Sequence, residues 1–267
     1  MSEGFDPDVV AKYERDIWSR CADNYGDTFA GITRQTVPLL VEAGEIGPGS
    51  QVLEIGSGPG HVADLLAKAG ASVTGVDFSL DMVEVAQKGY PDISFQQADA
   101  EQLPFEAEAF DVVVANFVVH HLARPEVVFR EVYRVLKAGG RFGFVVWGAP
   151  EEQSSIGAFF GAVEAHHDLG ELPQGPLFGV TERSVYEPML TAAGLADCKL
   201  AVHEVTWRTE SLDPVLRGFW DFGNMAALPA QIQERIKDAT RENARLYEQD
   251  DGYSFPHSVL LGGARKA

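Results

Sequence analysis

Short apolar runs alternate with amphipathic segments between residues 51 and 147. Each run is too short for a buried helix, so the pattern predicts strands at 51–55, 72–77, 93–97, 111–116 and 141–147. Between these runs, apolar residues recur at three- and four-residue steps, which predicts helices at 61–69, 80–89 and 125–137. Strands and helices that alternate in this way indicate an α/β fold with a parallel sheet and right-handed crossovers.

The pattern changes on both sides of this alternating core, which we place at 46–149. The segment 1–45 predicts helices, because Val10, Tyr13 and Ile17 form one apolar stripe. The segment 150–267 predicts two more strands and two helical insertions, at about 195–209 and 254–264 for the strands and about 150–180 and 211–250 for the insertions. We therefore expect a seven-stranded, mostly parallel sheet, with the three added helical segments forming a lid near its carboxyl end.

A glycine-rich turn follows the first predicted strand. Residues 52–60 read Val-Leu-Glu-Ile-Gly-Ser-Gly-Pro-Gly, so Gly56, Gly58 and Gly60 occupy every second position, and a helical pattern begins at His61. Glycine permits positive φ angles and lets a ligand lie against bare backbone, and the start of a helix presents unpaired N–H groups. The turn therefore predicts a nucleotide-type binding site at the carboxyl end of a strand.

The spacing of these glycines narrows the class of ligand. The dinucleotide fingerprint G-x-G-x-x-G would place its third glycine at the position that His61 occupies in this chain. Here the third glycine comes one residue earlier, and Glu54 lies two residues before the first one. A nicotinamide-dependent oxidoreductase and a non-catalytic binding module remain alternatives on this evidence.

Polar residues also follow the next predicted strands. Asp77 ends the second strand, 21 residues after Gly56, where a carboxylate can accept hydrogen bonds from both hydroxyls of a ribose. The third strand leads into Asp-Ala-Glu-Gln-Leu-Pro-Phe at 99–105, and the fourth ends at Asn116. A fifth segment, Arg-Val-Leu-Lys-Ala-Gly-Gly at 134–140, leads into the fifth strand.

Together these five segments, spanning residues 52–147, resemble the motifs of class I S-adenosylmethionine-dependent methyltransferases. The resemblance is to the subgroup that includes the ubiquinone and menaquinone biosynthesis methyltransferases, and it departs from the usual "R-x-L-K-P-G-G" segment in having Ala138 instead of proline. It implies a Rossmann-like fold, S-adenosylmethionine as cofactor and S-adenosylhomocysteine as product. The added helical segments would then determine the choice of substrate.

The resemblance also implies roles for individual residues. Around the methionine part of the cofactor and its backbone cradle it places Glu54, Gly56, Ser57, Gly58, Gly60 and Asn116. Around the ribose and adenine it places Asp77, Phe78, Met82, Asp99 and Ala100, and over the cofactor it places Tyr25. Asp77 would accept from the ribose hydroxyls and Asp99 from the adenine amino group.

Two adjacent histidines are the candidate catalytic residues. His120 and His121 follow the fourth strand, where the resemblance places the reactive methyl group. Methyl transfer from a sulfonium is an in-line displacement that depends mainly on alignment, and a general base helps only when the nucleophile is protonated. Histidine can accept a proton near neutral pH, but the subgroup commonly carries histidine at this place, so a structural hydrogen bond is the alternative.

Composition restricts the partners. The chain has 21 basic and 40 acidic residues, a net charge of −19, whereas binding a nucleic-acid backbone needs clustered Lys and Arg. We expect no nucleic-acid partner, no membrane span, no metal and no signal peptide, hence a cytoplasmic protein. We predict an S-adenosylmethionine-dependent methyltransferase that acts on a small, largely apolar molecule at oxygen, nitrogen or carbon.

Overall fold

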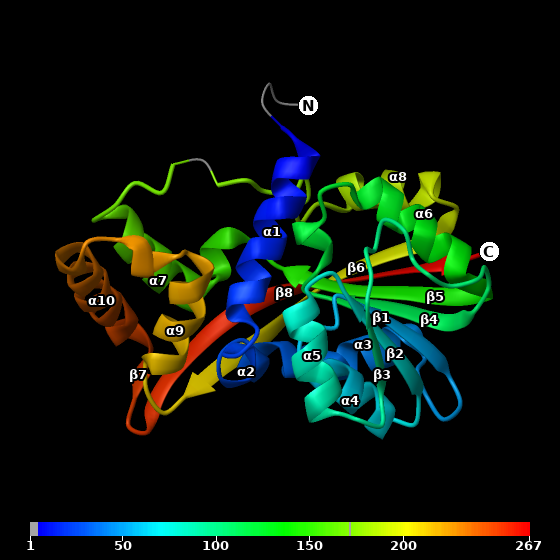
Figure 1. Ribbon diagram of the computed structural model, residues 1–267, viewed down its shortest axis with the longest axis horizontal. Coiled ribbons are helices and arrows are strands. Elements are labelled where there is room, and N and C mark those ends of the chain that lie inside the picture. Colours follow the sequence, from blue (N-terminus) through cyan, green and yellow to red (C-terminus); the bar gives the residue numbers. More distant parts are fainter. Residues whose placement is uncertain (1–4, 171) are drawn as a thin grey trace.

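One mixed β-sheet organises the molecule (Figure 1). The computed structural model describes residues 5–170 and 172–267, and in this part of the chain the sheet has the order β3-β2-β1-β4-β5-β8-β6. The strands are β1 Gln51–Ile55, β2 Ser72–Asp77, β3 Ser94–Gln97, β4 Phe110–Asn116, β5 Leu136–Trp147, β6 Leu195–Thr209, β7 Glu248–Gln249 and β8 Gly252–Lys266. The prediction of a mostly parallel α/β sheet is confirmed, but the described chain has eight strands instead of seven, because the two-residue β7 pairs with β8.

The strand order creates a switch point in the middle of the sheet. Strand β1 pairs in parallel with both β2 and β4, so the chain builds the sheet outward in two directions from β1. The pairs Ile55↔Val76 and Ile55↔Ala115 bring the carboxyl ends of these three strands side by side. Open α/β sheets bind ligands at such a point, because the loops after the strands diverge and leave a crevice.

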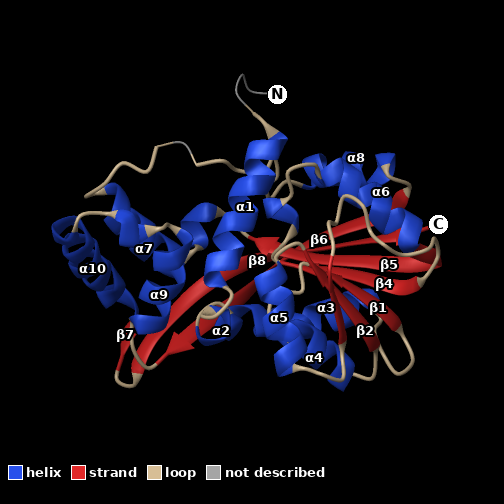
Figure 2. Cartoon of the chain, in the orientation of Figure 1, coloured by secondary structure: helices blue, strands red, loops and turns tan. Residues whose placement is uncertain are grey.

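Helices cover both faces of the sheet (Figure 2). One face packs against α3 Val37–Gly44, α4 His61–Lys68 and α5 Leu80–Gly89, and the other against α6 Pro125–Val135 and α8 Arg183–Ala192. Successive strand residues point to opposite faces, so Val52 joins the first core and Leu53 the second. Both are fully buried, which explains why the strands appear as continuous apolar runs in the sequence.

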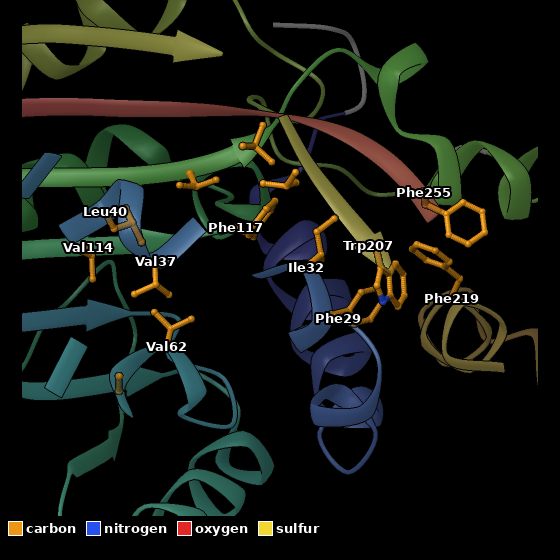
Figure 3. Close-up of a cluster of buried hydrophobic side chains, with 14 of the residues drawn as sticks. Phe29, Ile32, Val37, Leu40, Val62, Val114, Phe117, Trp207, Phe219 and Phe255 are labelled. Atoms are coloured by element: carbon orange, nitrogen blue, oxygen red, sulfur yellow. The ribbon is translucent and has the colours of Figure 1, made fainter. Parts of the chain in front are cut away.

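The remaining helices lie at the margins of this core: α1 Pro7–Cys21, α2 Ala30–Thr33, α7 Ser154–Glu164, α9 Asp213–Phe222 and α10 Ala230–Ala244. Strands β6 and β8 each have 15 residues and extend beyond the rest of the sheet, and α7, α9 and α10 gather around this extension (Figure 1). Phe219, Trp207 and Phe255 pack there in one apolar cluster with Phe29 (Figure 3). None of the described helices has the length and apolar character that crossing a bilayer requires.

Candidate functional site

A cavity lies at the switch point of the sheet. It is lined by residues from the carboxyl ends of the first four strands and from the N-terminal segment. The strand-end residues include Gly56, Gly58, Asp77, Phe78, Ala98, Asp99, Ala100, Asn116 and Phe117, and the N-terminal residues are Ala11, Glu14, Arg15, Trp18 and Tyr25. Loops that are distant in sequence therefore converge because their strands end at one edge of the sheet.

Bare backbone forms part of the lining at Gly58. This glycine has φ +50°, and a Cβ added to it would meet only Met82 Sδ, at 4.0 Å. A larger side chain would therefore extend from Gly58 into space that the cavity leaves open, beside Met82, which also lines it. The loop is shaped to let a ligand approach its main chain.

Asp77 lies beneath this loop with its carboxylate fixed by two backbone groups. The Gly58 N–H donates to Oδ2 at 2.8 Å and the Ser79 N–H donates to Oδ1 at 2.9 Å. Burial raises the pKa of Asp77 to about 6, although these N–H donors act in the opposite direction. Each oxygen accepts one bond from the protein and retains a further acceptor site, so an ionised Asp77 can also accept from two hydroxyls of a ligand.

The charge of the lining suits a cationic ligand. Four carboxylates line the cavity, from Glu14, Asp77, Asp99 and Glu101, and one guanidinium, from Arg15. The Arg15 guanidinium lies over the Phe78 ring, 5.6 Å from its centroid. A positive sulfonium nucleoside therefore fits both the bare backbone and the charge of this site.

Helix α1 closes one side of the cavity. The Glu14 carboxylate lies 3.0 Å from Nδ1 of His121, which follows β4. Within α1, the indole N–H of Trp18 donates to Glu14 at 3.1 Å. The α1 residue Ser19 shares a 3.1 Å hydrogen bond with Ser79, next to Asp77. In Figure 1 this helix stands, in blue, against α5 and α9. The lid thus contributes side chains to the site as well as covering it.

Most of the residues that the sequence pointed to meet at this cavity. The lining includes Tyr25, Gly56, Gly58, Asp77, Phe78, Met82, Asp99, Ala100, Asn116 and His121. Asn116 is held rigidly, because its amide donates to the Thr33 carbonyl at 3.0 Å and accepts from the Thr36 hydroxyl at 2.8 Å. Among the predicted residues alone, the cavity therefore brings together positions that the sequence separates by up to 96 residues, from Tyr25 to His121.

Three residues expected in the cradle lie behind it instead: Glu54, Ser57 and Gly60 are outside the lining. Gly60 packs against α5 and β3, since an added Cβ would meet Phe95 at 2.8 Å. The Ser57 hydroxyl and Glu54 Oε2 are buried and have no partner among the described residues. Burial, followed by the charge of Asp77, raises the pKa of Glu54 well above its usual value.

His120 also lies outside the lining, which separates the two candidate histidines. Its ring is buried, and neither nitrogen has a partner among the described residues. Burial, followed by the charge of His121, lowers the pKa of His120 well below its ordinary value. His120 is therefore a neutral ring in the protein interior, and its expected catalytic role stays a prediction.

The lid differs from the expected one. Of the three added helical segments, only 1–45 contributes described residues to the lining. The segments 150–180 and 211–250 pack mainly around the extension of β6 and β8, and Phe178 approaches the His121 ring at 6.1 Å between centroids without lining the cavity. Aromatic contacts between the two segments stabilise this packing. For example, the ring centroids of Phe159 and Phe219 lie 5.5 Å apart.

Glu14 is a residue of this site that the sequence analysis did not predict. It is 5% exposed, and it lies on the same buried face of α1 as Val10, Ile17 and Cys21. Glu14 follows Val10 by four residues and precedes Ile17 by three, so the sequence places a carboxylate within an apolar stripe. This pattern could have indicated a functional or structural role, because a buried charge needs a specific partner. That partner, His121, follows 107 residues later and could not be identified from the helix alone.

The fold and the cavity define an α/β domain with a nucleoside-type site at its switch point. Residues 53–144 match the family model described as "Methyltransferase domain". The uncharacterized methyltransferase YcgJ of Bacillus subtilis is 36% identical over 140 residues, which cover 51% of this chain and 55% of that protein. A demethylmenaquinone methyltransferase of Renibacterium salmoninarum is 35% identical over 135 residues, which cover 51% of this chain and 57% of that protein.

Solved structures agree with this assignment of the domain. A crystal structure from Bacillus halodurans, described as a candidate methyltransferase, superposes with a TM-score of 0.58 at 26% identity, covering 87% of this chain and 99% of that one. Residues 53–144 therefore match a methyltransferase domain, and the predicted resemblance to class I S-adenosylmethionine-dependent methyltransferases is confirmed. The chain spans little more than half the length of the first curated relatives, at 55% and 57%.

Proposed function

We propose that this protein transfers a methyl group from S-adenosylmethionine to a small, largely apolar molecule. The observation that carries the proposal is the cavity at the switch point, where the bare backbone of Gly58 and the carboxylates of Asp77 and Asp99 line the same space. A methyltransferase domain covers the loops that form this cavity. Among these groups, Asp77 would bind the ribose hydroxyls, and Asp99 and Ala100 the adenine edge.

The rest of the lining supports the choice of cofactor and acceptor. Phe78 and Met82 provide apolar surface beside Asp77, and Asn116 and Tyr25 line the same cavity near the N-terminal segment. S-adenosylmethionine supplies an activated methyl group on a positive sulfur, so the task of these residues is to align the acceptor and exclude water. The aromatic lining favours an apolar acceptor, and the name of one relative denotes a demethylmenaquinone substrate.

The charges also argue against a nucleic-acid acceptor. Arg15 is the one cationic side chain among the described lining residues, beside four carboxylates, whereas a phosphate backbone needs several cations. Cys21 and Cys198 are both buried and free, which is typical of a reducing compartment. A cytoplasmic location is therefore part of the proposal.

Two measurements test the proposed function. Thermal unfolding of the purified chain should shift upward with S-adenosylhomocysteine and stay unchanged with NAD, since binding to the native state stabilises it. Release of S-adenosylhomocysteine should then accompany methylation of at least one member of a panel of phenols, amines and quinols. A shift with NAD and none with S-adenosylhomocysteine would favour an oxidoreductase, and binding without turnover would indicate a non-catalytic sensor of the cofactor.

A further inference from the structure

A glutamate and a histidine from distant parts of the chain meet at the cavity. Glu14 Oε1 lies 3.0 Å from Nδ1 of His121, and Glu14 Oε2 accepts the Trp18 indole N–H at 3.1 Å. The Trp18 ring also meets the His121 ring edge-on, with centroids 5.2 Å apart. Both carboxylate oxygens are therefore engaged, and the imidazole is fixed in orientation by a side chain of the lid helix α1.

This arrangement determines which nitrogen of His121 is available. A carboxylate beside Nδ1 favours the tautomer that carries its proton on Nδ1, so Nε2 keeps its lone pair. Nε2 forms no hydrogen bond with the described residues, and the side chain, 12% exposed, lines the cavity. His121 is thus arranged as a proton acceptor directed by Glu14, whereas the neighbouring His120 is enclosed in the core.

We propose that the acceptor is a phenol, that His121 Nε2 accepts its hydroxyl proton, and that Glu14 is the positioning residue. The inference rests on the proposed function and names its substrate class. A base accelerates methyl transfer only to a nucleophile that is protonated, so a carboxylate, which is ionised at neutral pH, would not need one. A phenol has a pKa of about 10, like tyrosine, and is therefore protonated at neutral pH. The Trp18 ring, which lines the cavity beside His121, suits a planar aromatic acceptor.

The step is balanced without any further reactant. A lone pair of the phenol oxygen forms the new bond to the methyl carbon, while the bond from that carbon to sulfur breaks and its electron pair stays on sulfur. The O–H proton moves to Nε2 of His121. The products are an aryl methyl ether, S-adenosylhomocysteine and an imidazolium that the Glu14 carboxylate stabilises until its proton passes to solvent.

A series of phenols of different acidity tests this role. Wild type and His121→Gln are assayed at pH 8 with saturating S-adenosylmethionine, using 4-methylphenol, which is protonated at that pH, and 4-nitrophenol, which is largely ionised. We expect His121→Gln to lower kcat for 4-methylphenol by about 10² to 10⁴ and for 4-nitrophenol by less than about tenfold, because an ionised acceptor needs no base. A purely structural role of His121 would reduce both rates equally.

Matched variants separate positioning from folding. Glu14→Gln should show the same dependence on phenol acidity with a smaller loss of kcat, and KM for the phenol should stay within about threefold. His166→Gln and Glu84→Gln change the same residue types outside the cavity lining and should behave as wild type. If His121→Gln does not fold, Glu14→Gln provides the same comparison.

The possible failures are distinguishable. If S-adenosylhomocysteine binds but amines or carboxylates are methylated and no phenol is, or if nothing on the panel is methylated, the phenol assignment is overturned. If the variants slow both phenols equally, the role of His121 as a base is overturned. If calorimetry shows that S-adenosylhomocysteine does not bind the wild-type chain, the proposed function itself fails.

Discussion

Replacing Asp77 with asparagine removes one charge from the cavity and keeps the shape of the side chain. Asp77 is 5% exposed, and its carboxylate accepts the Gly58 N–H at 2.8 Å and the Ser79 N–H at 2.9 Å. An amide has only one oxygen, so in Asp77→Asn the N–H of either Gly58 or Ser79 loses its acceptor. A ribose hydroxyl would also lose a charged hydrogen-bond acceptor. The variant should therefore weaken binding of S-adenosylhomocysteine without changing the fold.

The size of the effect follows from the type of hydrogen bond. A bond to a charged group contributes about 1.5 to 3 kcal/mol, so the Kd should rise by about 10- to 150-fold. Burial raises the pKa of Asp77 to about 6 in the free protein. Because the ionised form is the acceptor, wild-type affinity should be lost as pH falls through this pKa, by about tenfold at pH 5, and should be level above pH 7.

Calorimetric titration with S-adenosylhomocysteine between pH 5 and pH 8 measures both effects. Asp81→Asn serves as the control, since Asp81 lies exposed in the first turn of α5 and outside the cavity lining. The Asp77→Asn variant should bind weakly, with little dependence on pH. A Kd within about twofold of wild type at pH 7.5, or a wild-type Kd that is constant down to pH 5, would refute the reasoning.

Three further changes test other parts of the structure. Gly58→Val should abolish S-adenosylhomocysteine binding in calorimetry. Gly89→Val is the control and should retain binding, because a Cβ added at Gly89 has no neighbour within 4 Å. Equal binding by the two variants would contradict the role of the loop. Ile32→Ala should lower the free energy of unfolding in urea by about 2 to 5 kcal/mol, because Ile32 is fully buried (Figure 3), and a loss below about 1 kcal/mol would contradict this packing. Burial lowers the pKa of His257 to about 4. Below pH 6.5 the unfolded chain therefore gains a proton at this residue that the folded chain does not gain. The free energy of unfolding of the wild type should fall by about 3 kcal/mol toward pH 4 because of this group. His257→Gln should make that pH dependence shallower by the same amount, and parallel curves would contradict it.

Local sequence patterns were sufficient to predict most of the sheet. The strands at 51–55, 72–77 and 195–209 have the predicted bounds, because buried strands and glycine turns are specified by adjacent residues. The strand expected at 141–147 begins earlier, at Leu136, which pairs with Phe110 across the sheet. That pairing is a tertiary contact that overrides the helical pattern, and the helix expected at 125–137 ends at Val135.

The candidate site was predictable where it depends on strand ends. Asp77 and Asp99 line the cavity because Asp77 ends β2 and Asp99 follows β3. Glu54 lies outside the lining and its expected role stays a prediction, because strand residues alternate between faces and closeness to the glycines in sequence does not by itself place a side chain in the cavity. The pairing of Glu14 with His121 depends on how α1 packs over the sheet, which no local pattern specifies.

The most direct test of the account is a crystal structure of the chain with S-adenosylhomocysteine. The account predicts that the nucleoside occupies the cavity at the ends of β1, β2 and β4, with its ribose hydroxyls within hydrogen-bond distance of Asp77 and its adenine beside Asp99. A nucleoside bound elsewhere, or one in this cavity whose ribose makes no contact with Asp77, would contradict the central claim.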